Sequence, residues 1–114
     1  MDSIIEQKSF QFAVRIVKLC KHLRGAKREY TLSKQLLRAG TSIGANASEA
    51  QQAQSRADFV SKLCISLKET TETKYWLKLL RATDYLSEIE FQSIFTDCVE
   101  NEKILVSIIK TVKK

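Results

Sequence analysis

The chain has 114 residues, which is enough for one domain with one hydrophobic core. Its hydrophobic content of 44%, the absence of proline and the presence of only three glycines argue against wholesale disorder and against a many-stranded sheet. The formal net charge is +6. No apolar run approaches the roughly 20 residues that span a bilayer, and residues 1–8 lack the apolar segment of a signal peptide. We therefore expect a cytoplasmic protein without a membrane segment.

The first predicted helix covers residues 3–23. Its apolar residues recur at helical spacing and mark the side that we expect to be buried: Phe10, Ala13, Val14, Ile16, Val17, Cys20 and Leu23. Gly25 follows, and a glycine just beyond a helix favours the left-handed conformation that ends it. Residues 25–28 then form a short link to the second helix.

The excess positive charge is confined to the first third of the chain. Residues 1–38 hold nine Lys or Arg against three Asp or Glu, whereas residues 39–114 hold ten of each. Six basic residues and no acidic one occupy positions 15–28: Arg15, Lys18, Lys21, Arg24, Lys27 and Arg28. One interpretation is a solvated surface that serves solubility. The other is a surface that contacts the phosphates of RNA or DNA.

The second predicted helix covers residues 29–54. Gly40 and Gly44 lie four residues apart on it, and small residues in such a row let another helix approach closely, within the subunit or between subunits. Four polar residues follow one another at spacings of four, four and three beside an apolar line: Arg38, Ser42, Asn46 and Glu49. Charged groups at the edge of a buried stripe require partners.

The third predicted helix covers residues 56–82 and the fourth covers residues 88–112. Ser55 is a candidate N-cap with Asp58 in the first turn, and Ser87 with Glu90 has the spacing of a capping box. The third helix carries apolar residues on two sides, which suggests that an oligomer buries one of them. Four helices of about 20–27 residues joined by short links predict an all-α, antiparallel up-down-up-down four-helix bundle, with residues 1–114 as a single domain.

Two carboxylates of the third helix, Glu69 and Glu72, lie in phase with its second apolar side, near Trp76. We expect them to meet the polar residues of the second helix, because charges of opposite sign compensate one another where water is scarce. The predicted structural polar network comprises Arg38, Ser42, Asn46, Glu49, Glu69 and Glu72. It either fixes the register of the two helices or forms a cleft between them for a polar ligand or RNA.

The sequence lacks the residue patterns of common catalytic sites. His22 is the only histidine, and we expect it to be solvated at the end of the first helix, so no Ser-His-Asp or Cys-His arrangement is supported. There is no glycine-rich phosphate loop, and the carboxylates lack the Glu-x-x-His pairs of a di-metal bundle. Cys20, Cys64 and Cys98 fall in apolar helical phases, as core thiols do. We therefore expect no enzyme activity, no catalytic residue, no metal site and no cofactor.

Three segments together carry a family resemblance: RAGTSIGANASEA at residues 38–50, Asp58-Phe59, and KETTETKYWL at residues 68–77. They resemble the bacterial "four helix bundle protein" family, which includes proteins encoded within intervening sequences of 23S ribosomal RNA genes. That family is related to the accessory variability determinant of diversity-generating retroelements. This chain departs from the family pattern at Ala47, where isoleucine is common, at Ala50, where glycine is common, and in lacking a proline before the second helix.

The resemblance implies a small all-helical subunit that assembles into a ring, with a pentamer favoured. Its retroelement relatives are basic and bind nucleic acid beside a reverse transcriptase, and no enzymatic activity is established for the family. We therefore predict a non-enzymatic, oligomeric nucleic-acid-binding protein, associated with RNA through the basic surface of the first helix. The alternative is a protein-interaction scaffold without nucleic-acid binding, whose basic surface serves solubility or meets an acidic protein partner.

Overall fold

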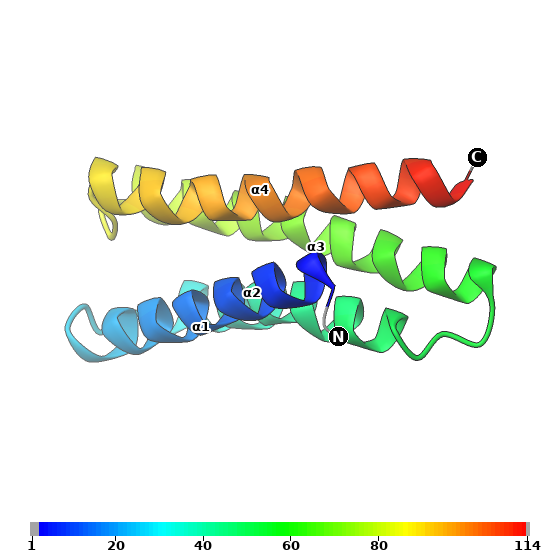
Figure 1. Cartoon of the computed structure of the whole chain (residues 1–114). Coiled ribbons are helices and arrows are strands. Elements are labelled where there is room, and N and C mark those ends of the chain that lie inside the picture. The colour runs from blue at the N-terminus through cyan, green and yellow to red at the C-terminus, as the bar shows by residue number, and fades with distance from the viewer. Residues whose placement is uncertain (1–2, 114) are drawn as a thin grey trace.

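The computed structural model describes residues 3–113 as four antiparallel α-helices, which confirms the predicted all-α bundle. The helices are α1 (Ile4–Gly25), α2 (Thr31–Ala50), α3 (Arg56–Ala82) and α4 (Glu88–Lys113), and no β-strand occurs across these residues. They form a rod with extents of 44 × 22 × 20 Å. Figure 1 shows the α1–α2 pair beside the α3–α4 pair, with α4 continuing past the start of α1.

Each helix packs most extensively against its neighbours in sequence, and the seam between α1 and α4 is the thinnest. Two ion pairs bridge that seam, between Lys8 Nζ and Glu100 Oε1 at 3.2 Å and between Arg15 Nη1 and Asp97 Oδ2 at 2.6 Å. The α1–α4 seam therefore has the least extensive packing of the four helix contacts and is bridged by two ion pairs.

Helix starts follow the predicted capping chemistry. The Ser55 hydroxyl accepts a bond from the Asp58 backbone N–H at 3.0 Å, which confirms Ser55 as the N-cap of α3. The Ser87 backbone N–H donates to Glu90 Oε1 at 2.8 Å, and the Glu90 N–H donates to the Ser87 hydroxyl at 3.1 Å, so the capping box before α4 is confirmed.

Two predicted helix ends differ from the structure. Gly25 is the last residue of α1 and has ordinary helical geometry, and the residue with positive φ in the following link is Arg28, at 53°. The helix α1 therefore ends at Gly25, two residues later than the predicted end at residue 23. In addition, α2 ends at Ala50 and not at residue 54, because the backbone N–H groups of Gln51, Gln52 and Ala53 donate to carbonyls only three residues back.

The buried side of α1 also differs from the prediction. Phe10 is 69% exposed and Val14 is 39% exposed, although both were expected in the core. The residues that α1 buries are Ile5, Ser9, Phe12, Ile16, Cys20 and Leu23. The prediction used only apolar residues to locate the core-facing side, so it omitted Ser9, which is polar but buried. The predicted core-facing side is therefore rotated about the helix axis relative to the observed one.

Gly40 and Gly44 allow α1 and α2 to approach closely within the subunit. A Cβ atom built on Gly40 would lie 2.8 Å from Ile16 Cγ1, and one on Gly44 would lie 3.2 Å from the backbone oxygen of Ser9. The small residues of α2 therefore face α1, as the spacing of four predicted. This packing fixes how α1, with its basic residues, sits on the rest of the bundle.

Candidate nucleic-acid interface

The last two turns of α1 and the link after it carry a group of exposed cations, which we call the cationic end. It consists of Lys18, Lys21, Arg24, Lys27 and Arg28. All five are exposed, and none of them forms an ion pair within residues 3–113. Cations near a helix C-terminus are favoured there by the helix dipole, so this clustering is compatible with the stability of α1.

The link that follows α1 is held by Glu29 and Ser33. The Glu29 carboxylate accepts three backbone N–H bonds at the start of α2, from Thr31, Leu32 and Ser33, at 2.7–3.1 Å. The Ser33 hydroxyl donates to the Glu29 carbonyl at 2.9 Å and accepts a bond from Arg24 Nε at 3.3 Å. The cationic end is therefore attached to a link with a defined conformation.

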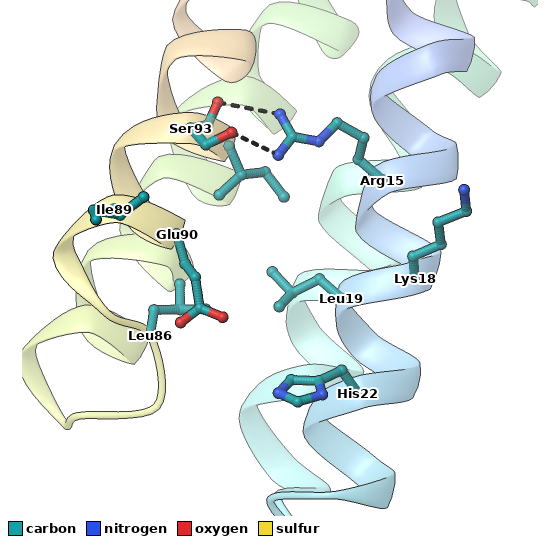
Figure 2. Close-up of a pocket in the computed structure, with 9 residues that line it drawn as sticks. Arg15, Lys18, Leu19, His22, Leu86, Ile89, Glu90 and Ser93 are labelled. Carbon is teal, nitrogen blue, oxygen red and sulfur yellow. Dashed lines mark hydrogen bonds between the residues drawn. The ribbon is translucent and has the colours of Figure 1, made fainter.

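Arg15 was predicted to contact nucleic acid, but the structure ties it to α4. Its Nη1 atom donates to the Ser93 carbonyl at 3.1 Å, and its Nη2 atom donates to the Ser93 hydroxyl at 2.9 Å (Figure 2). The same Nη1 atom also donates to Asp97 Oδ2. Its charge is compensated by Asp97, so it is less available to a phosphate than the five cations of the cationic end. Ser93 and Asp97 were not predicted as partners, although their spacing of four on one helix face was visible in the sequence.

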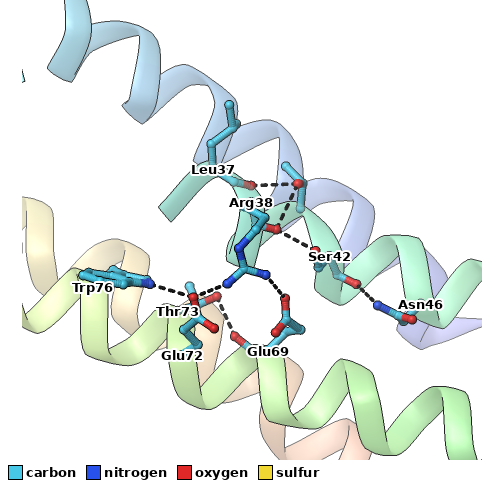
Figure 3. A network of polar contacts seen from close by, with 9 residues as sticks. Leu37, Arg38, Ser42, Asn46, Glu69, Glu72, Thr73 and Trp76 are labelled. Carbon is cyan, nitrogen blue, oxygen red and sulfur yellow. Dashed lines mark hydrogen bonds and ion pairs between the residues drawn. The ribbon is translucent and has the colours of Figure 1, made fainter. Parts of the chain in front are cut away.

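The second predicted site, between α2 and α3, is built around Arg38. Its Nη1 atom donates to Glu69 Oε2 at 3.0 Å, and its Nη2 atom donates to Glu72 Oε2 (Figure 3). Glu72 Oε2 also accepts a bond from Trp76 Nε1 at 2.9 Å. The Trp76 N–H and then the Arg38 guanidinium lower the pKa of Glu72, while the bond to Glu72 raises the pKa of Arg38.

Three other members of the predicted network do not join it. The Ser42 hydroxyl donates to the Arg38 carbonyl at 2.6 Å, and Asn46 Nδ2 donates to the Ser42 carbonyl at 2.9 Å, so both satisfy their own helix (Figure 3). Glu49 instead accepts a bond from Lys62 Nζ at 3.1 Å. Spacing places residues on a common face but does not separate a bond to the neighbouring helix from a bond to the preceding turn.

The network also lies nearer to solvent than predicted, since the Arg38 side chain is 51% exposed. A guanidinium that is already paired with two carboxylates offers little free charge to a ligand. The α2–α3 contact therefore supports the interpretation that Arg38, Glu69 and Glu72 align two helices.

A family model described as "23S rRNA-intervening sequence protein" matches residues 1–107. The chain belongs to this family. It is also similar to a solved structure, that of a protein with unknown function from the S23 ribosomal protein family of Bacteroides thetaiotaomicron VPI-5482. The two are 55% identical with a TM-score of 0.93, and the match covers 94% of this chain and 99% of that chain. No curated protein matches the chain.

In this member of the 23S rRNA-intervening sequence protein family, two of the three cysteines are core residues. Burial raises the pKa of Cys20 to about 11 and that of Cys98 to about 12. Cys20 Sγ lies 3.4 Å from the Ser33 carbonyl oxygen as a hydrogen-bond donor, and Cys64 is only partly buried. Over the described part of the chain, no group of three or more His, Cys, Asp or Glu residues is arranged to hold a metal ion.

None of the helices described for this family member is both long and apolar enough to cross a membrane. His22, expected to be solvated, is exposed on α1 beside the cationic end. The cationic end and His22 therefore form one exposed surface on α1 and the link after it.

Proposed function

We propose that this member of the 23S rRNA-intervening sequence protein family is a non-enzymatic cytoplasmic protein that binds nucleic acid, chiefly RNA. The main support is the cationic end, where five exposed cations form no ion pair within residues 3–113. Such cations replace the counterions of a phosphate backbone and bind it with little dependence on base sequence. The choice of RNA is supported by the description of the family, which refers to 23S rRNA.

The cationic end can be tested by removing three of its charges. In the triple variant Lys18→Gln, Lys21→Gln and Lys27→Gln, the affinity for a fluorescein-labelled single-stranded RNA should fall at least about tenfold at 0.1 M salt. The matched control is Lys68→Gln, Lys103→Gln and Lys110→Gln, which removes the same charge from exposed positions on α3 and α4. Equal losses in both variants would show that net charge, and not the cationic end, governs binding.

We further propose that the protein is a homo-oligomer, with a pentamer favoured. Ile4, Phe10 and Val14 expose apolar surface on α1. Phe10 also lines a groove of about 430 Å³ between α1 and α2, together with the small residues Gly44 and Ala45. An exposed aromatic side chain beside a groove of small residues supports association with a second copy. An oligomer would repeat the cationic end and raise avidity for a long nucleic acid.

Light scattering tests the assembly. A pentamer of 13.0 kDa subunits has a mass of about 65 kDa (five times 13.0), and Phe10→Glu should shift the mass toward that of the single subunit. Lys103→Glu, which changes an exposed residue of α4, is the control. A wild-type mass of 13 kDa at micromolar concentration would reject the oligomer.

The same exposed apolar surface favours a second candidate function, that of a protein-interaction scaffold. The two functions separate in an affinity capture performed with and without nuclease. Partners that depend on nucleic acid disappear after nuclease treatment, whereas a directly bound protein partner stays.

A further inference from the structure

A cavity of about 590 Å³ lies between the C-terminal half of α1 and the start of α4, next to the cationic end. Figure 2 shows Leu19 reaching into this gap from α1, with Leu86 and Glu90 facing it from the other side. Its upper end is closed by the bonds between Arg15 and Ser93. The volume falls within the range of about 300–1,000 Å³ that is typical of small-ligand sites.

The cavity combines an apolar interior with both signs of charge at its rim. Leu19, Leu86 and Ile94 supply apolar surface, and His22 supplies ring nitrogens. Lys18 also lines the cavity, although its ammonium group is directed away from Leu19 (Figure 2). A planar base requires apolar walls, and the phosphate attached to it requires positive charge and N–H donors. The cavity has apolar side chains for the base and basic side chains for the phosphate close to one another.

Glu90 adds a hydrogen-bond acceptor at the same rim. Within residues 3–113, its carboxylate accepts a bond at Oε1, from the Ser87 backbone N–H at 2.8 Å, and Oε2 accepts none. The bonds with Ser87 lower the pKa of Glu90, and the nearby His22 and Lys27 lower it further, so the group is a carboxylate at neutral pH. A carboxylate accepts hydrogen bonds from an exocyclic amino group, such as N4 of cytosine, and repels the carbonyl O4 of uracil.

We propose that this cavity binds one unpaired nucleotide whose base carries an amino group, with cytidine as the representative case. The base lies against Leu19 and Leu86, and its amino group donates to Glu90. Its phosphate lies at the rim beside His22, and the exposed Lys18 side chain turns toward it when the nucleotide binds. The inference deepens the proposed RNA binding, since the cationic end would hold the chain from which this nucleotide projects. Binding in the cavity would make the protein prefer single strands over duplexes and bases with an amino group over bases without one. Phosphate contacts alone do not provide either preference.

The test compares two RNA decamers of equal charge, one of cytidines and one of uridines, by fluorescence anisotropy at one salt concentration. Contacts to phosphate alone predict equal affinities, whereas the cavity predicts that the cytidine decamer binds about tenfold more tightly. In Glu90→Gln this ratio should fall to about one, because an amide can also donate to O4 of uracil. Glutamine keeps an acceptor for the Ser87 N–H and therefore preserves the capping box.

Asp84→Asn is the matched control for Glu90→Gln. It removes the same negative charge from an exposed residue that does not line the cavity, and asparagine tolerates the positive φ of 68° at this position. Both variants should gain affinity for RNA through charge, but only Glu90→Gln should lose the preference for cytidine. A preference that persists in Glu90→Gln would overturn the assignment of Glu90.

The remaining outcomes separate this inference from the proposed function. Equal binding of the two decamers by the wild-type protein overturns the cavity and leaves the electrostatic proposal standing. If neither decamer binds, cytidine monophosphate is titrated while the methyl NMR signals of Leu19 and Leu86 are followed. Shifts at both residues would keep the cavity as a site for a free nucleotide and reject binding of the polymer, and unchanged signals would reject both.

Discussion

Gly40→Ala tests whether the α1–α2 contact depends on a missing side chain. The new Cβ atom would lie 2.8, 2.9 and 3.0 Å from three side-chain carbons of Ile16, which is fully buried. Overpacking of this kind costs about 1–3 kcal/mol, because neither helix can yield without disturbing its neighbours. Replacing a helical glycine by alanine contributes up to about 1 kcal/mol in the opposite direction. We therefore expect a net loss of about 1 kcal/mol.

Gly25→Ala is the matched control for this substitution. Gly25 is also helical, and a Cβ atom there would meet nothing within 4 Å, so only the favourable term of at most about 1 kcal/mol applies. Urea unfolding followed by circular dichroism, at one protein concentration, should rank Gly25→Ala above the wild type and Gly40→Ala below it. The packing argument fails if Gly40→Ala is as stable as Gly25→Ala.

A double-mutant cycle adds a sharper readout at the same contact. Ile16→Ala alone removes a buried side chain and should cost about 2–5 kcal/mol. In the Gly40→Ala background the loss should be smaller by about 1 kcal/mol, because the new methyl group occupies part of the space that Ile16 leaves. Strictly additive losses would show that Gly40 and Ile16 do not share this contact.

Two further predictions concern Glu72 and the cysteines. The folded-state pKa of Glu72 is lowered from 4.5, so its stabilising contribution is complete above pH 4.5 and is lost as the pH falls through the folded-state value. Thermal unfolding between pH 7 and pH 3 should therefore depend less on pH in Glu72→Gln, by at most about 1 kcal/mol at this partly exposed site. Burial raises the pKa of Cys20 to about 11 and that of Cys98 to about 12, so at pH 8 both thiols carry very little thiolate. Cys64 is only partly buried and should therefore react first with a thiol reagent.

Each of these predictions has a control. Asp84→Asn removes an exposed carboxylate that forms no ion pair within residues 3–113, and this variant should keep the wild-type difference in stability between pH 7 and pH 3. An identical pH profile for Glu72→Gln and the wild type would contradict the role given to Trp76 and Arg38. Cys64→Ser should remove the fast labelling phase, and a fast phase that persists in this variant would show that the core thiols are accessible.

Helical periodicity and capping chemistry were sufficient to predict the bundle. The Ser55 and Ser87 caps are local, since each depends on a residue three positions away, and both occur as expected. The buried side of α1 was predicted correctly at Ile16, Cys20 and Leu23 but wrongly at Phe10 and Val14. The error arises because Ser9 faces Gly44 across the α1–α2 contact. A serine that fits only because the neighbouring helix has no side chain there cannot be recognised from one helix alone.

Partners of the charged residues were harder to predict than their positions. Arg38 meets Glu69 and Glu72 as expected, because regular helices bring these positions together. Arg15 has the same spacing pattern as the cationic end, yet it reaches Asp97 across the bundle. Pairs of this kind depend on the register between α1 and α4, which are separated by most of the sequence and are not joined by a short link.

The salt dependence of RNA binding tests the central claim about the cationic end most directly. Five phosphate contacts on a single strand predict a plot of log K against log salt with a slope of at least about −3.5, so that affinity falls about 100-fold between 50 and 200 mM salt. An oligomer that engages several cationic ends would steepen the slope. Binding whose affinity stays constant over this range, or no binding at 50 mM salt, would contradict the account.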